Sequence, residues 1–359
     1  MKLLNPGPVT LTARVRGALA REDMCHREPE FAELTKDVVA RLAAVYPEAR
    51  DGYVPVLLTG SGTAAVEAMI GSLVPRGATA LVVANGVYGE RAAAMLDAQG
   101  KGHSLVRSDW TAPMRLDEVE NRLDKGGFSH VVAVHHETTT GRLNDIAALG
   151  ALCKQRGVPL LLDAVSSFGG EDIRFDEWNL EACAATANKC LHGVPGIAFV
   201  LADARVFDGK RTSGATSVYL DLFRYRKEQL TGFSPFTQSV QALFALQEAL
   251  RELEDAGGWT KRHARYRAIS SRVMEHLRAL GVDLMLESPS AYSSILTAYK
   301  MPAGATYAKL HDDLKAAGFV IYAGQGQFSG SIFRIAVMGD LSDGDIDRLV
   351  VALKRSLTG

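Results

Sequence analysis

One feature constrains the fold most: short apolar runs alternate with helix-like stretches between residues 54 and 200. The runs are rich in β-branched residues and occupy residues 54–58, 80–83, 130–134, 159–162 and 196–200. Helical patterns lie between them at residues 63–73, 89–99, 116–123 and 146–156. Strands this uniformly apolar are covered on both faces, as in a parallel sheet. We therefore predict an α/β fold with a mostly parallel central sheet in a large domain.

The last third of the chain has a different pattern. After a Gly-Phe-Ser-Pro break at residues 232–235, one long helix is predicted over residues 238–254 and a second, basic one over 261–280. The remainder has a β-α-β-β-α pattern, at residues 291–299, 307–317, 319–323, 332–337 and 343–357. We expect a small α+β C-terminal domain at residues 251–359, a large domain at 16–250 and an N-terminal segment at 1–15 that joins the small one.

Composition excludes several classes of protein. The chain has 359 residues, of which 47% are hydrophobic and 23% charged, and its net charge is −1. Such a balance is typical of a soluble globular protein and offers no basic surplus for nucleic acid. No apolar run is long enough to cross a membrane, and Pro-Gly-Pro interrupts the N-terminus too early for a signal peptide. We expect a cytoplasmic protein with no membrane and no nucleic-acid partner.

The cysteines are too sparse for a disulfide framework. They are Cys25, Cys153, Cys183 and Cys190, and no pair has Cys-x-x-Cys spacing. We expect buried free thiols and no metal site.

A glycine-rich turn follows the first apolar run. Gly60-Ser61-Gly62-Thr63 leads directly into a helical pattern. The free N–H groups and the positive end of the helix dipole at such a turn suit a phosphate group. The alternative is an ordinary tight turn between a strand and a helix.

Two charged residues stand in apolar surroundings further along the chain. Asp163 ends the run at residues 159–162, where a carboxylate is costly unless it is paired. A protonated pyridine nitrogen is one suitable partner, and a helix cap or a salt bridge is the alternative. Lys189 lies among small residues, where confinement would lower its pKa and make its amine a nucleophile. The alternative is a solvated surface lysine.

A fourth motif, His-His-Glu-Thr-Thr-Thr-Gly at residues 135–141, follows the run at 130–134. Ligands of such sheets bind beyond the carboxyl ends of the strands, so these polar groups are expected to share one site. A phosphate turn, a strand-end aspartate and a lysine about two dozen residues later together indicate pyridoxal 5′-phosphate (PLP). The sequence therefore predicts a PLP enzyme with the cofactor on Lys189.

The chain resembles the class V aminotransferases, which are PLP enzymes of fold type I, and the resemblance covers nearly its whole length. Within that class it is most similar to the 2-aminoethylphosphonate–pyruvate transaminases. The motifs that carry the resemblance are Asn5-Pro6-Gly7-Pro8, Gly60-Ser61-Gly62-Thr63, Asn85-Gly86-Val87-Tyr88-Gly89, Glu137-Thr138-Thr139-Thr140-Gly141, Asp163-Ala164-Val165-Ser166-Ser167, Ala187-Asn188-Lys189-Cys190, Gly193-Val194-Pro195-Gly196, Leu220-Asp221-Leu222 and Phe333-Arg334-Ile335.

The resemblance implies a homodimer with its sites at the subunit interface, and a role for each matching residue. Lys189 would hold PLP and move a proton, and Asp163 would pair with the ring nitrogen. The remaining roles are phosphate binding by Ser61, Gly62 and Thr63, ring packing by Tyr88 and Val165, a hydrogen bond from Thr139 to the ring hydroxyl oxygen, contact of Thr237 with the partner subunit's phosphate, and binding of the substrate's carboxylate or phosphonate by Arg334.

This chain departs from the family pattern at two places: it has Pro235-Phe236-Thr237-Gln238 where the family often has Ser-Pro-Thr-His, and it differs at a position that concerns the substrate. The family often has lysine where this chain has Gln325, shortly before the Arg334 strand. A second anion contact is expected from Arg27, in a His-Arg-x-x-Glu-Phe pattern, with an ion pair to Glu28 or Glu30 as the alternative.

We expect one of three enzyme functions, because Lys189 and Asp163 together disfavour a non-catalytic binding protein of the same fold. The first is transfer of an amino group from 2-aminoethylphosphonate or a similar small amine to pyruvate, giving phosphonoacetaldehyde and alanine. The second is an alanine–glyoxylate or serine–glyoxylate aminotransferase, which differs only in the donor pocket. The third is a class V lyase of the desulfurase kind, which needs a mobile cysteine. The loop at residues 324–330 contains none, and this disfavours the lyase.

Overall fold

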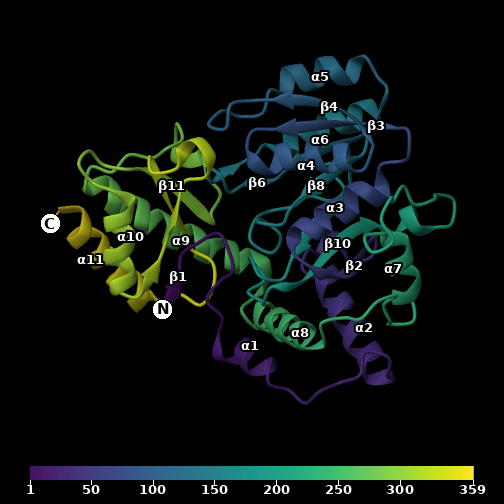
Figure 1. Ribbon diagram of the computed structural model, residues 1–359, viewed down its shortest axis with the longest axis horizontal. Coiled ribbons are helices and arrows are strands. Elements are labelled where there is room, and N and C mark those ends of the chain that lie inside the picture. Colours follow the sequence, from purple (N-terminus) through teal and green to yellow (C-terminus); the bar gives the residue numbers. More distant parts are fainter. Residues whose placement is uncertain (359) are drawn as a thin grey trace.

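The computed structural model describes residues 1–358 and is built around a seven-stranded sheet (Figure 1). The strands lie in the order β2 (Tyr53–Gly60), β10 (Gly196–Asp203), β9 (Leu180–Thr186), β8 (Leu160–Asp163), β5 (Phe128–Val134), β3 (Thr79–Ala84) and β4 (Gly102–Arg107). Only β10 pairs antiparallel with its neighbours, β2 and β9. All five predicted apolar runs are strands of this sheet, and the expected mostly parallel α/β fold is confirmed.

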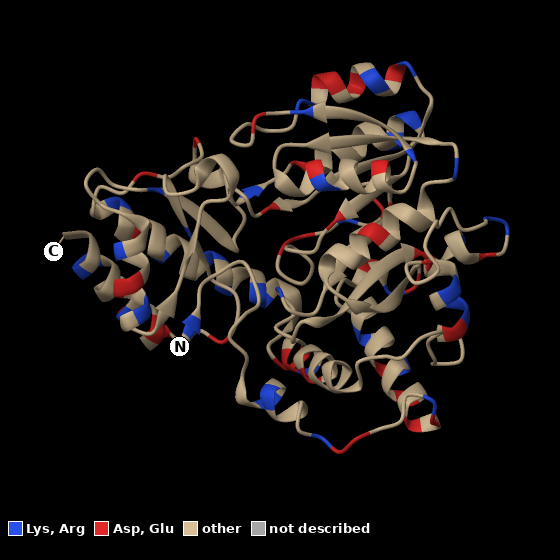
Figure 2. Ribbon diagram, in the orientation of Figure 1, with Lys and Arg blue, Asp and Glu red and all other residues tan. Residues whose placement is uncertain are grey.

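Helices cover both faces of this sheet. On one face lie α2 (Pro29–Ala44), α5 (Leu116–Asp124), α6 (Ile146–Arg156) and α8 (Val240–Asp255). On the other lie α3 (Gly62–Leu73), α4 (Val87–Ala98) and α7 (Leu222–Gln229). Each face of the sheet has its own hydrophobic core. Because side chains alternate across a strand, Leu57 of β2 packs in the first core and Val56 in the second. In Figure 2 the strands are largely uncharged, whereas acidic and basic residues mix on the outer helices.

A smaller sheet lies beside the large one and shares a core with α9 (Gly258–Ala279), α10 (Tyr307–Ala316) and α11 (Asp343–Thr358) (Figure 1). Its order is β11 (Leu296–Lys300), β14 (Ile332–Ala336) and β13 (Tyr322–Ala323). The N-terminal strand β1 (Lys2–Leu3) pairs with β12 (Phe319–Val320). Two further short strands, β6 (His136–Glu137) and β7 (Arg142–Leu143), form a hairpin beyond β5. The domain division at residues 15/16 and 250/251 remains our proposal.

Four expectations need correction. Strands β4 and β9 carry no long β-branched run and were not predicted. The strand expected at residues 291–299 begins only at Leu296, because Pro289–Ala291 forms a 3₁₀ turn. The single strand expected at 319–323 is two strands, β12 and β13, in different sheets. Three cysteines are buried free thiols as expected, but Cys25 is exposed.

No helix among residues 1–358 has the length and apolarity that crossing a membrane requires.

Candidate active site

The N-terminus of α3 forms one end of the candidate site. Its N-cap residue, Ser61, makes no side-chain capping bond, so the first N–H groups of the helix are left for another acceptor. Ser61 and Thr63 are exposed, whereas Gly62 is buried. A Cβ atom on Gly62 would lie 2.6 Å from Val165 Cγ1, so only glycine lets the turn pack against Val165. This is the arrangement that an anion such as phosphate needs.

Asp163, the last residue of β8, lies next to this turn. Its Oδ1 accepts a hydrogen bond of 3.0 Å from the N–H of Val165. Burial raises the pKa of Asp163 to about 6, although that N–H bond and the charges of Lys189 and Arg91 act in the opposite direction. A buried carboxylate with so few donors can still accept a bond from a cationic partner.

Lys189 follows β9, whose neighbour in the sheet is β8. The unpredicted strand β9 therefore explains why Lys189 reaches the same edge as Asp163. Burial lowers the pKa of Lys189 to about 8. Its ammonium group donates to the carbonyl oxygen of Pro6, and a Cβ atom on Gly7 would lie 2.7 Å from Lys189 Cδ. The N-terminal segment thus packs directly on the lysine.

The Glu-Thr-Thr-Thr loop after β5 lies against the start of α4. Glu137 accepts hydrogen bonds from the Thr139 hydroxyl at 2.6 Å and from the Tyr88 N–H at 3.2 Å. The guanidinium of Arg91 lies over the Tyr88 ring, 4.8 Å from its centroid, and reaches Thr63 Oγ1 at 3.5 Å. These contacts connect the predicted ring-binding residues to the phosphate turn.

Arg334, on β14, brings the smaller sheet to the site. Its side chain is buried and donates to the carbonyl oxygens of Thr138 at 2.7 Å and Ala323 at 2.9 Å, and to Gln325 Oε1 at 3.2 Å. All three acceptors are neutral. Asp340, the nearest acid along the chain, pairs with Lys2 instead. A buried cation without a carboxylate partner is suited to binding an anionic ligand.

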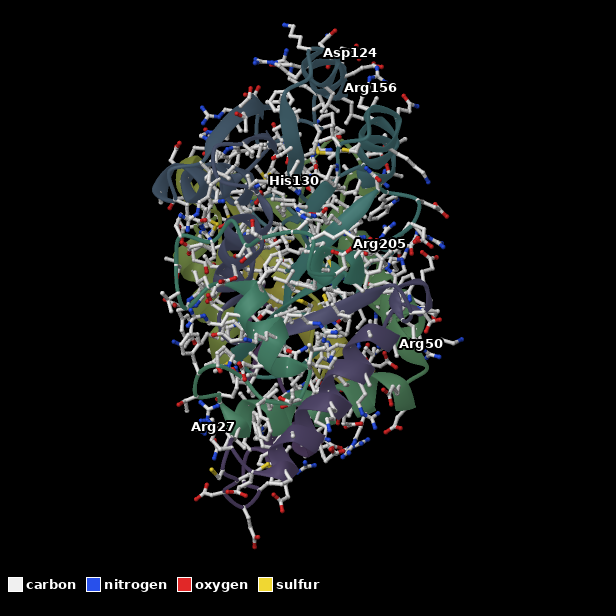
Figure 3. All side chains as sticks on the ribbon, turned by 90° about the vertical axis from the view of Figure 1, so that its right-hand side faces the viewer. Arg27, Arg50, Asp124, His130, Arg156 and Arg205 are labelled. Carbon is white, nitrogen blue, oxygen red and sulfur yellow. The ribbon has the colours of Figure 1, made fainter. Side chains whose placement is uncertain are left out.

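Two predicted residues do not join this cluster within the chain. Thr237 is exposed. Arg27 is also exposed and lies near the lower end of the molecule in Figure 3, where it donates to the carbonyl oxygen of Ser234 at 2.9 Å. Arg27 therefore contacts the segment that carries Thr237 rather than Glu28 or Glu30, its expected alternative partners.

Sequence reasoning missed three residues of the cluster. Glu137 stands in a recognised motif and Arg91 lies two residues beyond another, but neither was given a role. Pro6 was part of a recognised N-terminal motif, yet it is 183 residues from Lys189 in the sequence, so their contact leaves no local signal.

The residues fit PLP. The open start of α3 suits its phosphate, the carboxylate of Asp163 suits its pyridinium, and the partly neutral amine of Lys189 suits its aldehyde. This fold and this sheet edge define a PLP-dependent transferase of fold type I.

Comparisons with known proteins agree. The family model described as Aminotransferase class-V matches residues 18–325. A 2-aminoethylphosphonate–pyruvate transaminase of Vibrio vulnificus is 36% identical over 99% of this chain and 97% of its own length. One of Aeromonas hydrophila is 37% identical over 98% of this chain and 93% of its own. The crystal structure of an alanine–glyoxylate aminotransferase from Nostoc superposes with a TM-score of 0.91 at 26% identity, covering 99% of this chain and 94% of that one.

The chain belongs to the class V aminotransferase family, and it is a PLP-dependent transaminase.

Proposed function

We propose that the chain transfers the amino group of 2-aminoethylphosphonate, or of a similar small amine, to pyruvate, giving phosphonoacetaldehyde and alanine. The observation that carries this proposal is Arg334, a buried guanidinium whose bonds within residues 1–358 go to neutral oxygens. A phosphonate and the carboxylate of pyruvate can each take paired hydrogen bonds from such a group. The names of relatives that are 36% and 37% identical over nearly their full length support the same substrates.

The remaining residues supply proton transfer and orientation. Bound PLP supplies an aldehyde that condenses with amines and a ring that withdraws electrons. Lys189, whose pKa is lowered to about 8 by burial, can take the proton from the carbon next to the substrate nitrogen and later release it. Asp163 holds the proton of the ring nitrogen. Arg334 fixes the far end of the substrate, so the carbon that loses a proton stays near Lys189 Nζ.

We also propose a cytoplasmic homodimer. Arg27 and the Thr237 segment lie together on the surface, outside the cluster around Lys189. In a dimer Thr237 would contact the phosphate, and Arg27 the substrate, in the site of the partner subunit.

A substrate comparison tests the proposed amine. The PLP-loaded enzyme is mixed without pyruvate with 2-aminoethylphosphonate, β-alanine, alanine or serine, and loss of the cofactor's visible absorbance is followed. β-Alanine is the matched control, since it has the same carbon spacing with a carboxylate in place of the phosphonate. We expect the fastest loss with 2-aminoethylphosphonate.

Reaction with alanine or serine but not with 2-aminoethylphosphonate would contradict the proposal. It would favour a glyoxylate-type aminotransferase, the activity for which the Nostoc protein is named.

A further inference from the structure

Glu137 is a buried carboxylate that the proposed reaction does not use. Its side chain is fully buried at the end of β6, two residues before Thr139. Oε1 accepts from both the hydroxyl and the N–H of Thr139, at 2.6 and 3.2 Å. Oε2 accepts from the N–H of Tyr88 at 3.2 Å. The carboxylate therefore joins two residues that are predicted to contact the cofactor ring.

The start of α4 is shaped around this carboxylate. A Cβ atom on Gly86, the N-cap of α4, would lie 2.2 Å from Glu137 Cδ, so a side chain there would displace the carboxylate. The N-terminal end of a twelve-residue helix favours a negative charge close to its N–H groups. The charged groups that face Glu137 from other elements are Asp163 of β8 and Arg334 of β14.

The hydroxyl of Thr139 has one proton, and its short contact with Glu137 indicates that this proton is donated to the carboxylate. Its short bond to Glu137 uses the proton, because an ionised carboxylate can only accept. The hydroxyl oxygen also takes a long bond of 3.4 Å from the N–H of Val87. What remains on Thr139 toward the cofactor is a lone pair, which can accept a hydrogen bond but cannot donate one.

We propose that Glu137 is a positioning residue that sets the protonation of the bound cofactor. By accepting the hydrogen bond that the Thr139 hydroxyl donates, it leaves Thr139 as an acceptor toward the cofactor and so favours the protonated PLP ring hydroxyl over its anion. This inference rests on the proposed cofactor site. Burial raises the pKa of Glu137 to about 7, so Glu137 itself gains or loses a proton near neutral pH. Protonated Glu137 would release Thr139 to donate.

A spectroscopic pH titration of the PLP-loaded enzyme without substrate tests this role. In Glu137→Gln the neutral amide accepts the Thr139 hydroxyl proton more weakly than the carboxylate does, so Thr139 can donate to the cofactor and the cofactor loses its own proton more easily. The midpoint of its absorbance change should fall by about one pH unit. Glu171→Gln is the matched control, since Glu171 is also a buried glutamate but bonds His263 and Ser294, away from Thr139. Its midpoint should stay at the wild-type value.

Variants at Thr139 test whether Glu137 acts on the cofactor through the Thr139 hydroxyl. Thr139→Val keeps the shape and removes the hydroxyl, so it should lower the midpoint by itself, and adding Glu137→Gln should then have less than half of its former effect. Thr139→Ser keeps the hydroxyl and should retain the full effect. Because Thr139→Val gives its own result, the inference stays testable even if Glu137→Gln does not fold.

The outcomes separate this inference from the proposed function. Wild-type chain that takes up no PLP would overturn both. An unchanged midpoint in PLP-loaded Glu137→Gln, or a full shift that persists in the Thr139→Val background, would overturn the role of Glu137 alone.

Discussion

At the scale of single residues, the chemistry of the candidate site rests on Asp163 and Lys189, which end or follow neighbouring strands at one sheet edge. Both were recognisable because a charge next to an apolar run is costly without a partner, and the structure buries Asp163 and half-buries Lys189 at that edge. Glu137 could not be assigned from sequence, because its role depends on the start of α4, about fifty residues earlier. The contact of Lys189 with Pro6 was hidden for the same reason.

Asp163→Asn is expected to separate catalysis from cofactor binding. An amide cannot stabilise a protonated ring nitrogen as an anion does, so turnover should fall by roughly two to three orders of magnitude. The PLP content should fall little, since the start of α3 and Lys189 persist. Both quantities are measured on the same preparation. Asp145→Asn, which changes the N-cap of α6, is the control. Near-normal turnover in Asp163→Asn would show that the carboxylate is structural.

Arg334→Lys is expected to weaken the binding of both substrates. Lysine keeps the charge but loses the planar pair of donors, so each substrate should lose about 1–3 kcal/mol of binding energy. The cofactor's absorbance should be unchanged. Affinities are measured for the amine and for pyruvate separately. If the variant unfolds and whatever folds keeps its affinities, the bonds of Arg334 to Thr138 and Ala323 are its main role and the anion site lies elsewhere.

At the scale of helices and strands, periodicity located most elements and failed where a strand lacks a continuous run of large apolar side chains. The predicted helices at residues 63–73, 146–156 and 343–357 agree with α3, α6 and α11 to within about one residue. Strand β9 is rich in alanine, and β4 is a partly exposed edge strand, so neither has a long run of large apolar residues. Residues 291–295 were predicted as the first part of a strand, but Ser293 and Ser294 instead bond His136 and Glu171.

Ser342→Ala tests the start of α11. Ser342 Oγ accepts from the Asp345 N–H at 3.1 Å, while Asp345 Oδ2 accepts from the Ser342 N–H at 3.0 Å. This reciprocal capping should be worth about 1 kcal/mol, so the variant should unfold at lower denaturant concentration. Ser329→Ala, at an exposed serine outside the long helices, is the control. Equal midpoints for the two variants would show that the cap contributes nothing.

At the scale of the whole molecule, the site depends on contacts between the two sheets, which sequence patterns do not reveal. Gly339, beyond β14, donates to His192 Nε2 at 2.9 Å, and Arg334 donates to Thr138. His136, beyond β5, bonds Ser293 at 2.8 Å. These bonds hold the strand of Arg334 against the loops that carry Lys189 and Thr139.

His136 should make this arrangement sensitive to acid. Its Nδ1 bonds the Ser166 carbonyl oxygen and its Nε2 the Ser293 hydroxyl, which suits a neutral ring. Burial lowers its pKa to about 4 from an unfolded value of 6.5, so the unfolded chain binds the proton first. Stability is therefore fully present above pH 6.5 and is lost as pH falls toward 4, by about 3 kcal/mol for this group.

Denaturant unfolding at several pH values between 6.5 and 4 measures this loss. His136→Gln cannot take up the proton and should lose less stability over the same range. Parallel losses in the variant and the wild type would exclude His136 as the cause.

Covalent labelling tests the central claim, that PLP is held on Lys189, most directly. The PLP-loaded enzyme is reduced with borohydride, digested, and mapped by mass spectrometry. We predict that the label is on the peptide containing Lys189 and that Lys189→Ala abolishes it. Lys101 is the main alternative site for the label, since it is a buried lysine. Its ammonium group donates to the carbonyl oxygens of Val74 and Gly214. Label on Lys101 or any other lysine, with Lys189 unmodified, would contradict the assignment.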